Sequence, residues 1–145
     1  MAERAKSEEE LRRLSMEMRY LEQTAEALQQ RIGMVNAAIT DISYANMSLD
    51  GLEKEKDSSE LLVPIGGSSY VKVKLADTNK VIIGMGSGVS VEKTFVDAKA
   101  ILKERLDELE KTMNSAQQQF SQVAERINSG RSRLENLLGA REGKP

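Results

Sequence analysis

The 145-residue sequence contains no cysteine, histidine or tryptophan. The absence of cysteine excludes disulfides, thiol catalysis and thiolate metal sites, and it is compatible with a reducing compartment. Without histidine, a common general base and metal ligand is missing as well. Adjacent carboxylates such as Asp107 and Glu108 fall on helix faces, where solvation explains them. We therefore expect no enzymatic activity, no metal site and no cofactor.

Aromatic residues and long apolar runs are also scarce. Aromatics make up 3% of the chain and charged residues 30%, so a single thick core is hard to build, whereas extended helical pairs need less. The polar N-terminus is unlike a signal segment, and no apolar run approaches the ~20 residues of a membrane span. The formal net charge of -2 gives no electrostatic footprint for nucleic acid or an anionic membrane. We expect a soluble, cytoplasmic protein.

Most of the chain instead has the heptad pattern of a coiled coil. Ser7 and Glu10 fit a capping box, which predicts a first helix over residues 7–56, ending between Leu52 and Lys56. Asn46 is the one polar residue at an a position, where such a residue usually fixes the register. The apolar positions are Leu11, Leu14, Met18, Leu21, Ala25, Leu28, Ile32, Val35, Ile39, Ile42 and Leu49.

A second heptad helix is predicted over residues 94–139, with Thr94 and Asp97 as its N-terminal cap. Only Gly130 interrupts its apolar positions, and Gly139 with residues 143–145 ends it. These apolar positions are Leu102, Leu106, Leu109, Met113, Ala116, Phe120, Val123, Ile127, Leu134 and Leu137.

Residues 60–93 have the two-residue period of strands. Turn signals at Gly66-Gly67, at Asp77–Asn79 and at Gly84–Gly88 separate four strands and predict two successive hairpins. Two hairpins alone are marginal in water, and open edges invite pairing with other chains. We therefore expect their apolar residues to drive oligomerisation, namely Leu61, Val63, Ile65, Val71, Val73, Leu75, Val81, Ile83, Val89 and Val91.

Because the hairpin segment reverses the direction of the chain between the two helices, these helices are predicted to be antiparallel, with both chain termini together at one tip. Setting Leu28 level with Phe120 aligns the a and d positions throughout. Met18 then faces Gly130, Ile32 faces Ala116 and Ile42 faces Leu106, so that large residues mostly oppose small ones, as close packing prefers.

Apolar residues near the tip are candidates for binding a partner. With Leu11 at position a, Met16 and Tyr20 fall at the outward f and c positions, and Leu138 falls at e. Exposed apolar side chains on a hydrophilic helix invite a partner, although scattered ones are common on protein surfaces. Leu11, Leu14, Leu134 and Leu137 join the candidate site if the last turns fray.

The central segment resembles the alpha class of the prefoldin family. The resemblance lies in Leu62–Gly67, Tyr70–Lys74, the turn Asp77–Asn79, Gly84–Val89 and Val91–Lys93, between two heptad helices. Two hairpins mark the alpha class, since the beta class has one. The match is closest to the archaeal alpha subunit and covers nearly the whole chain.

This resemblance implies an α+β fold, in which a long antiparallel coiled-coil hairpin carries two central β-hairpins that assemble into an intersubunit β-barrel. It implies a hexamer of two alpha and four prefoldin beta subunits. Its implied function is that of an ATP-independent chaperone, which captures unfolded client proteins at the coiled-coil tips and passes them to a group II chaperonin.

Two other interpretations stay open from the residues alone. One is a coiled-coil scaffold or tether that binds a specific folded partner. The other is nucleic-acid binding through a modest basic cluster of Arg126, Arg131, Arg133 and Arg141. The glycine-rich Gly84–Gly88 segment superficially resembles a phosphate cradle, but it matches neither G-x-G-x-x-G nor a Walker loop, and we predict a hairpin turn there.

Overall fold

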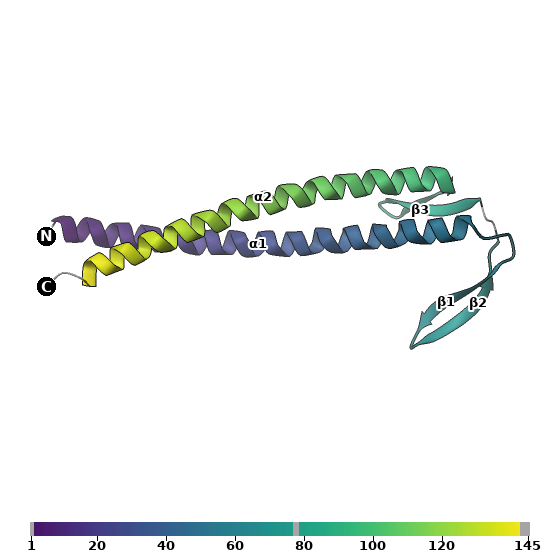
Figure 1. Ribbon diagram of the computed structural model, residues 1–145, viewed down its shortest axis with the longest axis horizontal. Coiled ribbons are helices and arrows are strands. Elements are labelled where there is room, and N and C mark those ends of the chain that lie inside the picture. The colour runs from purple at the N-terminus through teal and green to yellow at the C-terminus, as the bar shows by residue number, and fades with distance from the viewer. Residues whose placement is uncertain (1, 77–78, 143–145) are drawn as a thin grey trace. The chain divides into compact units, whose positions relative to one another are not determined.

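The computed structural model describes residues 2–76 and 79–142 and contains two long helices and two β-hairpins (Figure 1). This confirms the predicted α+β fold. The chain order is α1 (Ala2–Glu53), β1 (Glu60–Gly66), β2 (Ser69–Lys74), β3 (Lys80–Gly86), β4 (Val89–Thr94) and α2 (Phe95–Glu142).

The first helix starts earlier than predicted. It begins at Ala2, so the capping box assigned to Ser7 and Glu10 is wrong, and both residues lie inside the helix. The preceding residues Ala2–Lys6 are alanine, glutamate, arginine and lysine, which are strong helix formers and extend the helix without a cap at Ser7. The helix ends at Glu53, inside the predicted window.

The second helix begins where the sequence indicates but extends further. The Asp97 backbone N–H donates a 3.2 Å hydrogen bond to Thr94 Oγ1, which confirms Thr94 as the N-cap. The helix passes through Gly139 to Glu142, so the predicted end at residue 139 is wrong, because one glycine costs a helix only about 1 kcal/mol. The predicted stop at residues 143–145 lies outside the described residues.

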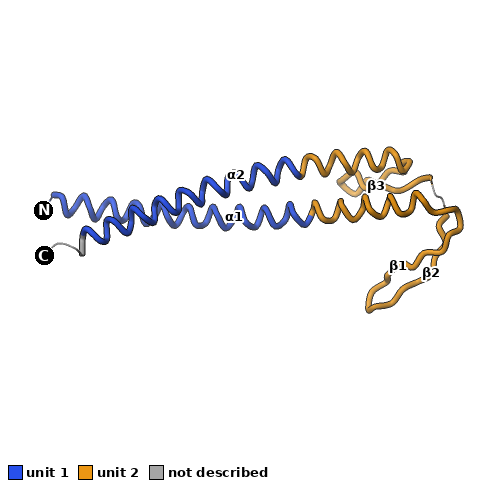
Figure 2. Tube along the Cα trace, viewed as in Figure 1, with its two compact units in different colours: residues 1–37, 110–145 blue, residues 38–109 orange. Residues whose placement is uncertain are grey.

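The chain divides into two compact units, coloured separately in Figure 2. We call residues 1–37 and 110–145 the terminal unit, because it contains both ends of the chain. Residues 38–109 form the hairpin unit, which contains all four strands and the adjoining ends of the two helices.

The two hairpins form separate two-stranded antiparallel sheets with the same register. Val63 pairs with Val71 in the first hairpin, and Ile83 pairs with Val91 in the second. Every paired residue of the second hairpin lies 20 positions after its counterpart in the first. The hairpins are therefore a structural repeat within the chain.

The turns of the two hairpins repeat as well. Each turn has two central residues with positive φ, Gly67 and Ser68 (56° and 59°) in the first hairpin and Ser87 and Gly88 (53° and 76°) in the second. Positive φ at both central residues is the mark of a type I′ turn, which matches the twist of the flanking strands. The turn predicted within Gly84–Gly88 is confirmed, but it consists of Ser87 and Gly88 alone, because β3 continues to Gly86. The turn predicted at Asp77–Asn79 includes Asp77 and Thr78, which lie outside the described residues.

The hairpin unit has its own hydrophobic core. Ile83 of β3 packs against Leu49 of α1 and against the first turns of α2, where Phe95 and Ala98 are 4% and 0% exposed. Alternation places Val81, Ile83 and Val91 on one face of the second hairpin, and this face meets the helices. The core is completed by Leu102, with Ile42, Ala45, Leu52, Val81 and Ile101 packed around it.

Candidate functional site

The helices of the terminal unit pack in the predicted antiparallel register. The sulfur of Met18 lies against the backbone of Gly130, at the place that a side chain on residue 130 would occupy. Met18 is 8% exposed, and Ala116 on the opposite helix is 3% exposed. The pairing of Met18 with Gly130 is therefore confirmed. Because Gly130 has no side chain, the Met18 side chain fits against the backbone of α2 at this point.

An ion pair joins the two helices nearer to the chain ends. Arg133 Nη2 lies 2.6 Å from Glu10 Oε1, and the side chains of Arg133 and Glu10 are 65% and 36% exposed. Such exposed pairs contribute little to stability, at most about 1 kcal/mol. This pair does, however, hold the Arg133 guanidinium over α1.

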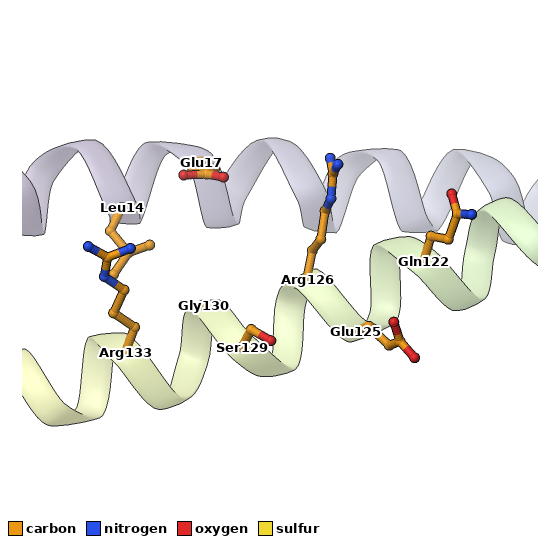
Figure 3. Close-up of a pocket in the computed structure, with 8 residues that line it drawn as sticks. All are labelled: Leu14, Glu17, Gln122, Glu125, Arg126, Ser129, Gly130 and Arg133. Carbon is orange, nitrogen blue, oxygen red and sulfur yellow. The ribbon is translucent and has the colours of Figure 1, made fainter.

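A groove of about 450 Å³ lies beside this ion pair (Figure 3). Ser129 and Gly130 line it on the α2 side, while Leu14 supplies an apolar side chain from α1. Figure 3 shows Arg126 and Arg133 both extending from α2 toward α1. The remaining lining residues are Glu17, Gln122 and Glu125.

The residues proposed for client binding fall into two groups. Met16, Tyr20 and Leu138 are 66%, 68% and 40% exposed, so they are accessible to a partner. The other four side chains are half-buried between the helices, namely Leu11, Leu14, Leu134 and Leu137. Of these, Leu14 also reaches the groove.

Sequence reasoning missed other exposed apolar residues on α1. Met34 in the terminal unit is 75% exposed, and Tyr44 and Met47 in the hairpin unit are 65% and 67% exposed. Heptad position was the signal that could have found them, because these residues stand at outward c, f and b positions when Leu11 is a.

The two hairpins differ in how far their apolar residues are covered. On the first, Val63 and Val71 form a cross-strand pair in which each is 42% exposed, and Ile65 is 65% exposed. Leu61 and Val73 form the next pair on the same face and are half-buried, as is Leu75.

The second hairpin requires one correction to the predicted oligomerisation residues. Ile83 is 7% exposed and belongs to the core of its own chain, because its face of the hairpin rests on the helices. Val81 and Val91 are half-buried, while Val89 is 55% exposed. Sequence alternation alone could not show which hairpin the helices cover. The exposed hairpin residues that were missed are Leu62, Tyr70, Ile82 and Met85.

Polar contacts hold the covered hairpin and the helix ends together. Arg105 Nη2 on α2 donates a 2.7 Å hydrogen bond to the carbonyl oxygen of Gly84 in β3. Lys99 on α2 bridges to α1, with its Nζ 2.7 Å from Asp50 Oδ1 and also in contact with Glu53. The hydrogen bond from Lys99 lowers the pKa of the Asp50 carboxyl below 3.8. The hydrogen bonds to Asp50 and Glu53 raise the pKa of Lys99 above 10.5.

The part of the chain that the structure describes contains neither a candidate metal site nor a candidate membrane-spanning helix. No cluster of three carboxylates with metal-binding geometry occurs there. None of the helices in that part is long and apolar enough to cross a membrane.

Comparison with known proteins supports the resemblance seen in the sequence. The family model described as "Prefoldin subunit" matches residues 21–139. The chain belongs to the prefoldin family. Prefoldin subunits are chaperones without enzymatic activity, and they assemble with other prefoldin subunits.

Several curated prefoldins are similar over most of the chain. The prefoldin subunit alpha of Methanococcoides burtonii is 32% identical over 93% of this chain and 95% of its own length. The prefoldin subunit alpha of Pyrococcus horikoshii is 32% identical over 85% and 84%, respectively. The prefoldin subunit 5 of Pongo abelii is 38% identical over 74% and 70%. The predicted resemblance to the archaeal alpha class is thereby confirmed.

Two solved structures share the prefoldin fold. A filamentous prefoldin from Methanocaldococcus jannaschii superposes with a TM-score of 0.67 at 22% identity, covering 77% of this chain and 92% of that one. The prefoldin beta subunit from Thermococcus strain KS-1 gives a TM-score of 0.59 at 17% identity, covering 88% and 90%.

Proposed function

We propose that this chain is a subunit of an ATP-independent chaperone of the cytoplasm. It captures unfolded proteins and passes them to a group II chaperonin. Membership in the prefoldin family supports this function. Holding a client requires no chemistry, because release follows from competition by another binder.

The open apolar face of the first hairpin is the observation that carries the proposed assembly. Leu61, Val63, Val71 and Val73 form two cross-strand apolar pairs on that face, and Val63 and Val71 keep 42% of their surface exposed. An isolated two-stranded hairpin is marginal in water. We infer that strands of other subunits cover this face in an intersubunit β-barrel, with two alpha and four beta subunits in the complex.

Client capture is assigned to the terminal unit. Met16, Tyr20 and Leu138 expose apolar surface there, and methionine adapts its shape to varied partners. Each such patch is small, so it binds weakly by itself. Several patches in one complex raise the effective concentration for a flexible client and hold it by multivalency.

The chain offers a matched pair of variants to test this assignment. Met16→Ser with Tyr20→Ser changes the terminal unit, and Met47→Ser with Tyr44→Ser changes residues of the same types and similar exposure in the hairpin unit. The measurement is the aggregation of an unrelated, chemically unfolded protein after dilution, with the assembled complex and without ATP. We expect the first variant to suppress aggregation less than the wild type, and the second to equal the wild type.

Two results would contradict the proposal. An equal loss of aggregation suppression in both variants would show that client binding is not confined to the terminal unit. A wild-type complex that ignores unfolded proteins but binds one folded partner would favour the scaffold or tether.

A further inference from the structure

Arginine and lysine are segregated between the two units. Nine of the ten arginines belong to the terminal unit, whereas eight of the eleven lysines belong to the hairpin unit. Net charge does not require this division, since both residues are cations at neutral pH. The two side chains differ in how they bind other groups. The planar guanidinium of arginine is weakly hydrated and stacks on aromatic faces, while the compact ammonium of lysine is strongly hydrated.

Two of these arginines flank the groove beside Gly130. Arg126 and Arg133 are seven residues apart on α2, which places them on the same side of the helix about 10 Å apart along its axis. Both extend toward α1 in Figure 3, with Ser129 and Gly130 between them. An aromatic ring in the groove can stack on either guanidinium, because a cation–π interaction is effective when the cation lies within about 6 Å of the ring centroid.

The groove also has the size and the apolar contact that an aromatic ring needs. Its volume of about 450 Å³ exceeds the ~150 Å³ of a cavity that holds benzene. Leu14 supplies aliphatic surface on the α1 side. The bond to Glu10 holds the Arg133 guanidinium in place, so less conformational freedom is lost when a ligand stacks on it.

The charges of the groove disfavour a polyanion. Glu17 and Glu125 line it together with Arg126 and Arg133, so the two carboxylates offset the two guanidiniums. A phosphate backbone would be repelled by the carboxylates as much as it is attracted by the arginines. A neutral ring with a negative face is attracted by the guanidiniums without that penalty.

We propose that the groove between Arg126 and Arg133 binds aromatic side chains of unfolded polypeptides. The inference rests on the proposed chaperone function and specifies the side-chain class that this prefoldin selects. Aromatic residues are mostly buried in folded proteins and exposed in unfolded ones, so a preference for them distinguishes a client from a native protein.

Charge-conserving substitutions test this proposal. Arg126→Lys with Arg133→Lys keeps the net charge and removes both guanidiniums from the groove. Arg12→Lys with Arg19→Lys is the matched control, because it removes two arginines from the same unit at exposed positions that do not line the groove. The probes are two fluorescently labelled, unstructured peptides that differ only in carrying phenylalanines or leucines. Their affinity for the full chain is measured by anisotropy, and circular dichroism checks that helix content is unchanged.

We expect the wild type to bind the phenylalanine peptide more tightly than the leucine peptide. The groove variant should bind the phenylalanine peptide about three- to tenfold more weakly and the leucine peptide unchanged, while the control variant equals the wild type for both. Equal wild-type affinities, or an unchanged affinity of the groove variant for phenylalanine, would overturn the inference.

Failure of the inference and failure of the proposed function give different results. If the wild-type complex suppresses aggregation but shows no preference for phenylalanine, only the groove assignment is wrong. If it suppresses no aggregation and neither peptide binds, the chaperone function itself fails.

Discussion

The two hairpins of this prefoldin subunit have the same backbone structure but differ in how far their apolar faces are buried. They share register and turn geometry at an offset of 20 residues, yet Ile83 is 7% exposed and its counterpart Val63 is 42% exposed. The second hairpin lies on the helices of its own chain, while the apolar face of the first is left open. The comparison shows that the same local sequence pattern can serve either the core of a subunit or an exposed apolar face, which we propose another subunit covers.

The largest expected difference between the hairpins comes from truncating these two equivalent residues. Ile83→Ala removes packing against Phe95 and Ala98 and should lower the free energy of unfolding by about 2–5 kcal/mol. Val63→Ala should lower it by about 0.5 kcal/mol or less, as for a surface position. Urea denaturation of the full chain measures both. Equal losses would show that the first hairpin is also part of the core.

A smaller effect is expected from the contact between Arg105 and β3. Arg105→Gln removes the hydrogen bond to the Gly84 carbonyl oxygen and should cost about 1 kcal/mol. Hydrogen exchange should then become faster in β3 and β4 and stay the same in β1 and β2. Faster exchange in both hairpins would indicate that they open as one unit.

Relieving the strained serines of the two turns should have an effect of about 0.5 kcal/mol. Ser68 and Ser87 have φ of 59° and 53°, a conformation that costs a residue with a side chain more than it costs glycine. Ser87→Gly should raise the free energy of unfolding, because the second hairpin unfolds with the core. Ser68→Gly should stabilise only the first hairpin, which slower amide exchange within β1 and β2 would reveal. A gain in global stability from Ser68→Gly would contradict this separation.

The smallest effect is the pH dependence of the Lys99 bridge. Because the pKa of Asp50 is lowered, its contribution is present above pH 3.8 and is lost as the pH falls through the lowered value. Because the pKa of Lys99 is raised, its contribution is present below pH 10.5 and is lost as the pH rises through the raised value. Lys99→Gln should therefore reduce the stability difference between neutral and extreme pH. Identical pH profiles for the variant and the wild type would show that the bridge contributes nothing.

Much of the fold was predictable because its signals are periodic. Heptad spacing placed both helices and set the register in which Met18 meets Gly130, and the two-residue period with glycine turns placed the four strands. The start of α1 was mispredicted because a capping box inside a run of helix formers does not begin a helix. The hairpin repeat could have been found by aligning the two turns, since both have a glycine-rich step after an apolar strand.

The environment of each hairpin could not be predicted from its sequence. Val63 and Ile83 occupy equivalent alternating positions, and only the packing against Leu49, Phe95 and Ala98 distinguishes them. The groove was missed for the same reason. Arg126 and Arg133 were visible only as a basic cluster, because the carboxylates that offset them come partly from the other helix. The side chain of Arg141, the last member of that cluster, lies outside the described residues.

The most direct test of this account makes the open face of the first hairpin polar without breaking the hairpin. Val63→Lys with Val71→Glu replaces the apolar pair by an opposite-charge cross-strand pair, which still supports strand pairing. Val63→Ile with Val71→Ile keeps the face apolar and serves as the control. The measurement is assembly with prefoldin beta subunits by analytical ultracentrifugation. We predict that the polar variant keeps the stability of the wild-type chain but fails to assemble, while the control assembles normally. A polar variant that assembles like the wild type would contradict the claim that this face is the surface left for another subunit.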